Sequence, residues 1–181
     1  MLLRRADCVE RLLAYDRACV VALNRALAHR PCLLLARAIS RLGDGELWVG
    51  LILVLALLHD GDGARCALHL AAAACGGLLI YLAMKRRAGR ARPYVHLKEL
   101  QLCARPLDEF SFPSGHTQHA VAFAIIVSAY FPALALLLVP FAVLTGIVRV
   151  VLGLHYPSDV LAGVVIGSGV ASLSLIALPV P

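Results

Sequence analysis

Long apolar segments constrain this chain more than any other feature of its sequence. A helix needs about 20 mostly apolar residues to cross a bilayer, and fewer where the bilayer thins. Suitable stretches are 46–59, 66–84, 117–138 with an interruption at Pro132, 133–152 and 160–178. The residue before a proline avoids helical geometry, so the interruption predicts two helices joined by a tight turn. We therefore expect five spans, of which 46–59 is the shortest, with Asp44 as its N-cap.

The composition favours the same class of protein. Of the 181 residues, 61% are apolar and only 15% are charged, whereas soluble domains carry about 25% charged residues. Such a chain has too little polar surface for a soluble globule and too many apolar groups to stay disordered. The expected fold is an all-α, polytopic membrane helix bundle of five to six transmembrane helices.

The first 42 residues differ from the rest of the chain. Apolar residues recur there at helical spacing, but eight arginines interrupt them. This pattern is typical of amphipathic helices that lie at the membrane interface, and a further span within 14–39 would explain it equally well. We expect residues 1–42 to form this interfacial region and residues 43–181 to form the membrane domain.

The segment 85–113 is a long polar connection in a chain whose other loops are short. It carries seven of the 17 lysines and arginines, and loops of this length are usually functional or disordered. Considered alone, the basic run would be interpreted as a surface for anionic lipid headgroups.

Three polar clusters are expected on one surface of the membrane. The clusters 85–93 and 112–116 lie on the connection between consecutive spans, and 149–159 lies two crossings later. An even number of crossings returns the chain to the same surface, so the three clusters can converge into one site.

Cations and a helix start in these clusters suit a phosphate ligand. Lys85, Arg92 and Arg149 are cations of the type that hold tetrahedral oxyanions, and the arginine fork matches phosphate oxygens. Ser114 and Gly115 precede an apolar helix, whose first backbone N–H groups attract an anion.

Two histidines and a carboxylate could supply the chemistry. His155 and Asp159 are four residues apart, close enough on one turn for Asp159 to hold one imidazole nitrogen. The other nitrogen is then free to attack or to take a proton, and His116 supplies a second imidazole. These groups suit phosphoryl transfer, and the chain has no dense carboxylate cluster for two metal ions.

Each of these residues has a simpler explanation when it is considered alone. Arg149 could snorkel, a single histidine is more often structural than catalytic, and Asp159 could merely start a helix. His116 and His119 could suggest a metal, but no third ligand lies nearby in the sequence. The functional interpretation therefore depends on the presence of all these residues together.

In combination, the clusters resemble the three-part signature of the type 2 phosphatidic acid phosphatase family, whose superfamily includes vanadium haloperoxidases and bacterial acid phosphatases. The matching motifs are Lys85-x6-Arg92-Pro93, Pro113-Ser114-Gly115-His116 and Arg149-x5-His155-x3-Asp159. The likeness covers roughly residue 43 to the C-terminus. One departure is Val148, where the family often has serine.

The resemblance implies a role for each matching residue. His155 would be the nucleophile that becomes a phosphohistidine, Asp159 would orient it, and His116 would act as general acid and then as base. The residues that would hold the non-bridging phosphate oxygens are Lys85, Arg92, Ser114, Gly115 and Arg149. The resemblance also implies that residues 43–181 form a phosphatase domain that works without a metal or other cofactor.

The leading hypothesis is an integral-membrane phosphatase that hydrolyses the phosphate or pyrophosphate of a lipid. From the resemblance we favour undecaprenyl pyrophosphate, followed by phosphatidylglycerophosphate or phosphatidic acid. The alternative is a non-catalytic membrane module that binds or transports a lipid phosphate at the same anion site, although a pure binder needs no nucleophile–carboxylate pair. The expected partners are the lipid substrate and the bilayer, without nucleic acid, and the sequence leaves the oligomeric state open.

The orientation of the site depends on which basic segment lies in the cytoplasm. The positive-inside rule would place 85–113 there. However, Lys85 and Arg92 are expected to bind phosphate, which would explain their charge without a cytoplasmic location. The N-terminal arginines could instead be the cytoplasmic segment. With six crossings both termini would be cytoplasmic and the site external, whereas with five the N-terminal helices would share the catalytic face. The resemblance implies a site on the outer face, so we expect a bacterial inner-membrane protein with its site on the periplasmic face.

Overall fold

The computed structural model describes residues 2–58, 61–104, 106 and 108–180, and nearly all of its regular structure is helical. The main helices are α1 (Leu2–Asn24), α2 (Arg30–Leu42), α3 (Glu46–Leu58), α4 (Gly61–Ala88), α5 (Pro93–His96), α6 (Gly115–Tyr130), α7 (Ala135–Val151) and α8 (Pro157–Ala177). Two short 3-10 helices, η1 (Arg25–Ala28) and η2 (Pro132–Leu134), connect them. The all-α class is confirmed.

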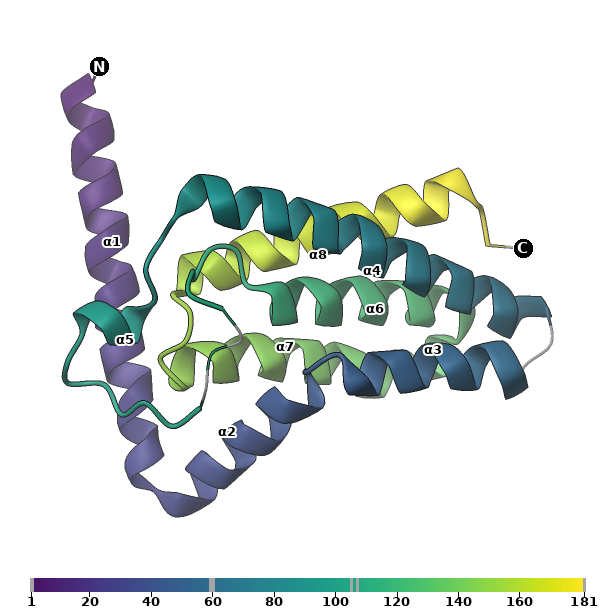
Figure 1. Ribbon diagram of the computed structural model, residues 1–181, viewed down its shortest axis with the longest axis horizontal. Helices are drawn as coiled ribbons and strands as arrows, with labels where there is room; N and C mark the ends of the chain where they lie inside the picture. The colour runs from purple at the N-terminus through teal and green to yellow at the C-terminus, as the bar shows by residue number, and fades with distance from the viewer. Residues whose placement is uncertain (1, 59–60, 105, 107, 181) are drawn as a thin grey trace.

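A bundle formed by α3, α4, α6, α7 and α8 makes up the larger part of the molecule (Figure 1). Helix α6 lies inside it and packs against α4, α7 and α8. Trp48 of α3 meets Phe123 of α6 edge to face, with ring centroids 5.0 Å apart. Helix α1 lies across one end of the bundle, and α2 leads from it obliquely to α3 (Figure 1).

Small residues bring α6 and α8 into close contact. A Cβ atom at Gly163 of α8 would lie 2.7 Å from the Ser114 carbonyl oxygen, and one at Gly167 would overlap the Gln118 carbonyl. Glycine at these positions lets the two backbones approach, as small residues do in membrane helix pairs. The contact places the start of α8 beside the start of α6.

Within the described residues, three helical segments are long and apolar enough to cross a membrane, namely α4, Pro132–Val151 and α8. Segments Val9–Ala28 and Arg30–Leu42 would add a fourth as one span, although they are bent by 114°. Helix α3 is apolar but shorter. The total of five or six spans stays a prediction, while the multi-pass membrane class is confirmed.

The helix boundaries follow the apolar segments with small shifts. The break at Pro132 is confirmed, because α6 ends at Tyr130 and α7 begins at Ala135 after the short η2 turn. Helix α4 extends to Ala88, four residues beyond the expected apolar span. His59, the expected end of the first span, lies outside the described residues.

The outer faces of the bundle remain apolar. Leu136 of α7 is 86% exposed and Ile176 of α8 is 74% exposed. Such side chains are suited to lipid chains rather than to water.

The N-terminal helices are joined to the bundle. Helix α2 packs against α7, while α1 packs against α7 and α8. The side chains that α2 buries are Ala36, Ile39 and Ser40. Their place at the membrane interface, and a domain boundary at residue 42, stay predictions.

Candidate active site

The three sequence motifs meet at the end of the bundle where α4 and α7 finish and α6 and α8 begin (Figure 1). Lys85 lies in the last turn of α4 rather than on the loop where we expected it. His116 likewise belongs to the first turn of α6. Arg92 lies on the loop after α4, and Ser114 and Gly115 lie at the start of α6. Arg149 lies in the last turn of α7. His155 precedes α8, and Asp159 lies in the first turn of that helix.

Most of these side chains are removed from water. Arg92 is 1% exposed, Arg149 3%, His155 2% and Asp159 0%. Buried charges are costly unless they are paired, so their partners define how the site works.

The hydrogen bonds of His155 determine its tautomer. Its Nδ1 donates to the Ser111 carbonyl oxygen at 2.6 Å. A carbonyl can only accept, so Nδ1 carries the proton and Nε2 keeps its lone pair. Arg92 Nη1 donates to Nε2 at 3.2 Å. Nε2 is therefore the ring nitrogen that carries the lone pair, and Arg92 is its partner.

The charges around His155 keep its ring neutral. Burial lowers the pKa of His155 well below its usual value of 6.5, and the nearby cations Arg149, Arg92 and Lys85 lower it further. A neutral ring is the form that can act as a nucleophile.

Asp159 does not hold the imidazole directly, contrary to the expectation from their spacing. Its Oδ2 lies 3.8 Å from His155 Nδ1, which is too long for a hydrogen bond. Oδ2 instead accepts the backbone N–H of Tyr156 at 2.8 Å, and Oδ1 accepts Arg90 Nη1 at 2.6 Å. The direct contact to Nδ1 comes from the main chain of Ser111, which no residue-type pattern could have indicated.

His116 has a carboxylate partner that the sequence analysis assigned to another task. Its Nε2 lies 2.6 Å from Asp44 Oδ1, whereas Asp44 was expected to cap α3. Gly43 permits this approach, since a Cβ atom there would lie 3.2 Å from His116 Cδ2. With Nε2 engaged by Asp44, Nδ1 is the other ring nitrogen of His116.

A second unexpected carboxylate, Asp108, lies between two cations of the anion site. Lys85 Nζ donates to Asp108 Oδ1, and Arg92 Nη2 donates to the same oxygen at 2.9 Å. Tyr81 donates its hydroxyl proton to Oδ2. Burial alone would raise the pKa of Asp108, but the bonds from Lys85 and Tyr81 and the charge of Arg92 lower it to about 2. Asp108 is therefore an anion that balances Lys85 and Arg92.

Arg149 contributes an unused donor. Its Nη1 donates to Ser40 Oγ of α2 at 2.7 Å. Its Nε is buried and has no hydrogen-bond partner among the described residues. A buried donor without a partner is rare, and it leaves Arg149 with an N–H group that could bind an anion.

The start of α6 is tied to α8. Ser114 N–H donates to the Asp159 carbonyl at 3.0 Å, and Ser114 Oγ lies 2.9 Å from Thr117 Oγ1. Tyr81 packs so closely on Gly115 that a Cβ atom there would lie 2.7 Å from its ring. The Ser114 N–H and hydroxyl thus have partners within the protein, and a role of Ser114 and Gly115 in holding an anion stays a prediction.

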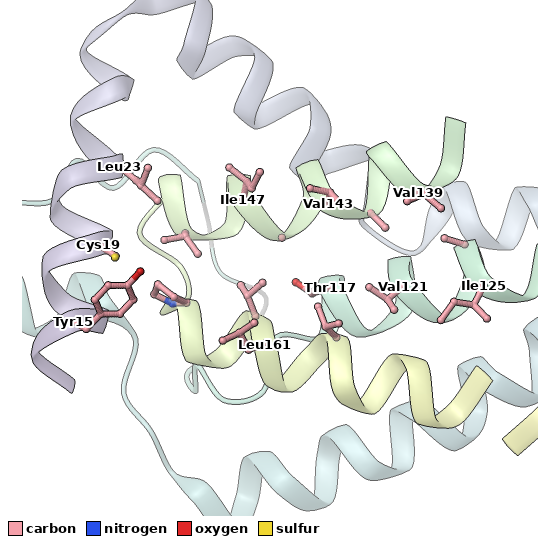
Figure 2. A pocket seen from close by; sticks show the side chains of 17 residues that line it. Tyr15, Cys19, Leu23, Thr117, Val121, Ile125, Val139, Val143, Ile147 and Leu161 are labelled. Atoms are coloured by element: carbon pink, nitrogen blue, oxygen red, sulfur yellow. The ribbon is translucent and has the colours of Figure 1, made fainter. Parts of the chain in front are cut away.

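Two apolar cavities lie near these residues. One of about 280 Å³ is lined by Asp44 and His116 together with apolar side chains of α3, α4 and α6. The other, of about 570 Å³, lies between α6, α7 and α8, with Tyr15, Cys19 and Leu23 of α1 at one end (Figure 2). None of the eight candidate residues lines the larger cavity. The smaller cavity is lined by two of the candidates, Gly115 and His116.

Within the part of the chain that the structure describes, no three His, Cys, Asp or Glu side chains gather in a way that could hold a metal ion. The ionic groups of the site are those of the residues named above.

Comparison with known families and proteins places these residues in context. The family model described as the PAP2 superfamily matches residues 66–179, a range that contains all eight candidate residues. The decaprenylphosphoryl-5-phosphoribose phosphatase of Mycolicibacterium smegmatis is 36% identical over 152 residues, which cover 82% of this chain and 81% of that protein. The lipid A 1-phosphatase of Rhizobium johnstonii is 37% identical over 105 residues, which cover 55% of this chain and 42% of that protein. The chain thus spans less than half of the latter relative.

Two solved structures have a similar fold. Aquifex aeolicus LpxE superposes with a TM-score of 0.75 and 26% identity, covering 87% of this chain and 92% of that chain. The PAP2 type phosphatidylglycerolphosphate phosphatase of Bacillus subtilis superposes with a TM-score of 0.71 and 25% identity, covering 91% and 84%.

Proposed function

The chain belongs to the PAP2 superfamily, and we propose that it hydrolyses a phosphomonoester of a membrane lipid through a phosphohistidine on His155. The chain is an integral-membrane phosphatase. The observation that supports this route most strongly is the hydrogen bond from His155 Nδ1 to Ser111, which leaves the Nε2 lone pair beside Arg92.

The first step forms one bond and breaks another. His155 Nε2 attacks phosphorus, and the bond between phosphorus and the lipid oxygen breaks. His116 gives a proton to the departing oxygen, so that a neutral alcohol leaves. Asp44, 2.6 Å from His116 Nε2, stabilises the protonated imidazole before transfer.

The second step returns the enzyme to its starting form. His116, now neutral, takes a proton from a water molecule, whose oxygen attacks phosphorus. The N–P bond breaks, and inorganic phosphate and neutral His155 are released. Lys85, Arg92 and Arg149 stabilise the charge on the equatorial oxygens in both steps.

The position of His116 indicates where the lipid enters. Because His116 protonates the leaving oxygen, the lipid portion lies on its side of the phosphorus. The apolar cavity of about 280 Å³ begins there and is lined by Trp48, Leu78 and Phe123. We propose that it receives the part of the lipid next to the leaving oxygen.

For the lipid itself we propose a polyprenyl carrier bearing a terminal phosphomonoester on its head group. The mycobacterial relatives named for such a lipid are 33% to 36% identical and align over 81% to 86% of their length. Undecaprenyl pyrophosphate, which the motif resemblance favoured, has the same kind of chain and is the competing substrate.

Phosphate release from a lipid panel tests this function. The purified chain, in detergent with EDTA, is offered a polyprenyl phosphosugar phosphate, undecaprenyl pyrophosphate, lipid A, phosphatidylglycerophosphate and phosphatidic acid. We expect turnover of the first to exceed the others and to vanish in His155→Ala. Wild type no faster than His155→Ala on every lipid would refute the phosphatase route, and preference for another lipid would refute the polyprenyl assignment.

We also propose that the site faces the periplasm of a bacterial inner membrane. Lys98 is exposed on the loop that carries Arg92. A cysteine introduced as Lys98→Cys, in a background without the native cysteines, should react with an impermeant reagent in intact spheroplasts. Labelling only after permeabilisation would place the site in the cytoplasm.

A further inference from the structure

Arg90 occupies one of the unspecified positions between Lys85 and Arg92 in the first motif, yet it joins two buried carboxylates. Its Nη1 donates to Asp159 Oδ1 at 2.6 Å, and its Nη2 donates to Asp16 Oδ2 at 2.7 Å. Asp159 is 0% exposed and Asp16 is 1% exposed. Among the described residues, Arg90 is the one cation that hydrogen-bonds to Asp159.

The main chain of Arg90 holds the other neighbour of the nucleophile. Ser111 N–H donates to the Arg90 carbonyl at 2.8 Å, and Ser111 Oγ donates to the same oxygen at 3.2 Å. The carbonyl of Ser111 in turn accepts from His155 Nδ1. Both groups that flank Nδ1, Ser111 and Asp159, therefore depend on Arg90.

Asp16 of α1 fixes the guanidinium from the far side. Its Oδ1 accepts the Ser158 backbone N–H at 3.0 Å, so it also tethers the first turn of α8. The Tyr156 ring covers the guanidinium, with Cζ 4.1 Å from the ring centroid. The bonds to Asp16 and Asp159 raise the pKa of Arg90 despite its burial, which by itself lowers it.

From this geometry we infer that Arg90 is a positioning residue for the proposed nucleophile, and that Asp16 of α1 is its anchor. Arg90 balances the charge of Asp159, so that this carboxylate does not draw a proton onto His155. It also holds Ser111 where Nδ1 must point. The N-terminal helix is thus part of the active-site support. This inference depends on the proposed phosphohistidine route.

The other charged groups around His155 and Asp159 are mostly cations. The charged and titratable groups that face the pair are Asp16 of α1, Lys85 of α4, Arg90, Arg92 and Asp108 of the following loop, His116 of α6, Arg149 of α7 and Tyr156 before α8. Without Arg90, Asp159 would be an unbalanced carboxylate 3.8 Å from Nδ1. An anion at this distance favours a protonated imidazole.

The test compares the pH dependence of kcat/KM for lipid phosphate hydrolysis in Arg90→Met, Arg90→Lys and the parent. Arg86→Met is the matched control, because Arg86 is exposed on the same basic segment. We expect the acid limb of Arg90→Met to move up by about 1 pH unit, since His155 must be neutral to attack. Arg90→Lys should keep the limb of the parent with a lower kcat, because it retains the charge and loses the fork.

A double variant separates charge from folding. In Arg90→Met with Asp159→Asn, both charges are gone, and we expect the acid limb to return to that of Asp159→Asn alone. An acid limb in Arg90→Met that coincides with the parent and with Arg86→Met would overturn the inference while leaving the phosphatase function standing.

An NMR titration of histidine-labelled protein keeps the inference testable without turnover. The pKa of His155, assigned from the signal lost in His155→Asn, should rise in Arg90→Met and stay unchanged in Arg86→Met. An unchanged value in Arg90→Met would overturn the inference. If the parent releases no phosphate but the pKa of His155 still rises in Arg90→Met, the proposed function alone is overturned.

Discussion

At the scale of single residues, Asp108 is the internal anion of the candidate site. Its carboxylate lies between Lys85 and Arg92 and balances their charge. Under the proposed function, a phosphate that enters the site competes with this internal anion, so the carboxylate weakens the binding of product phosphate.

We predict that Asp108→Asn binds inorganic phosphate more tightly than the parent. Removal of the internal anion leaves Lys85 and Arg92 with uncompensated charge, so the inhibition constant for phosphate should fall about tenfold, or about 1.4 kcal/mol. Competitive inhibition measured at constant ionic strength checks this. An equal or higher inhibition constant would show that Asp108 mainly orders the two cations.

The neutral state of His155 leads to a prediction for pH dependence. Burial and nearby cations place its pKa below 6.5, so the ring keeps its lone pair at pH 6.5 and loses it only as the pH falls further. The acid limb of kcat/KM should therefore lie below pH 6.5. A profile from pH 4.5 to 8 measures this, and a limb at or above pH 6.5 would contradict the burial of a neutral nucleophile.

His116 should matter most for poor leaving groups. We expect His116→Ala to slow hydrolysis of a lipid phosphate by at least about 100-fold. The loss should be much smaller with an aryl phosphate, whose phenolate leaves without a proton. His119→Ala is the control, because His119 lines the same cavity but bonds to the Gly115 carbonyl. Equal losses on both substrates would rule out the acid role.

At the scale of elements, the close contact of α6 with α8 builds the site. It sets Ser114 against the Asp159 carbonyl and so joins the second and third motifs. The contact depends on glycines whose substitution would force two backbones apart.

We predict that Gly167→Ala lowers the thermal midpoint in detergent, because its Cβ atom would overlap the Gln118 carbonyl oxygen. Overpacking of this kind costs about 1–3 kcal/mol. Gly169→Ala is the matched control on the same helix, since a Cβ atom there has nothing within 4 Å, and it should be neutral or stabilising. Equal midpoints for the two variants would refute the close contact.

The elements were largely predictable because lipid-facing helices have a simple requirement. Apolar length indicated α4 and α8, and Pro132 marked the break between α6 and α7. The sequence left residues 1–42 open because arginine at helical spacing fits either an interfacial helix or a span. The 114° bend between α1 and α2, and the contacts of both with the bundle, result from tertiary packing that periodicity does not report.

For the molecule as a whole, chain topology brings distant residues together, and here the motif residues were easier to predict than their partners. Motif spacing pointed to eight residues that the fold gathers at one end of the bundle. Asp44, Asp108, Arg90 and Asp16 were not assigned to the site, because each is an ordinary polar residue until folding places it beside a motif residue. The contact from the Ser111 carbonyl could not be predicted for a different reason, because every residue has a backbone carbonyl.

The fold also shows where part of the net charge of +6 lies. Lys85, Arg92 and Arg149 are buried around the proposed phosphate position. Buried cations in a membrane protein indicate a functional site by default. Other arginines, among them Arg17, Arg30 and Arg41 of the N-terminal helices, are exposed. The positive charge of the chain is therefore divided between this site and an exposed N-terminal region.

The central claim, a covalent phosphohistidine on His155, is tested most directly by trapping it. A lipid substrate with radioactive terminal phosphate is mixed with enzyme and quenched within milliseconds, and the protein is digested. We predict a label on the peptide that contains His155, stable in alkali and lost in acid as an N–P bond requires, and absent from His155→Asn. Turnover without labelled protein, or a label that persists in His155→Asn, would contradict the account.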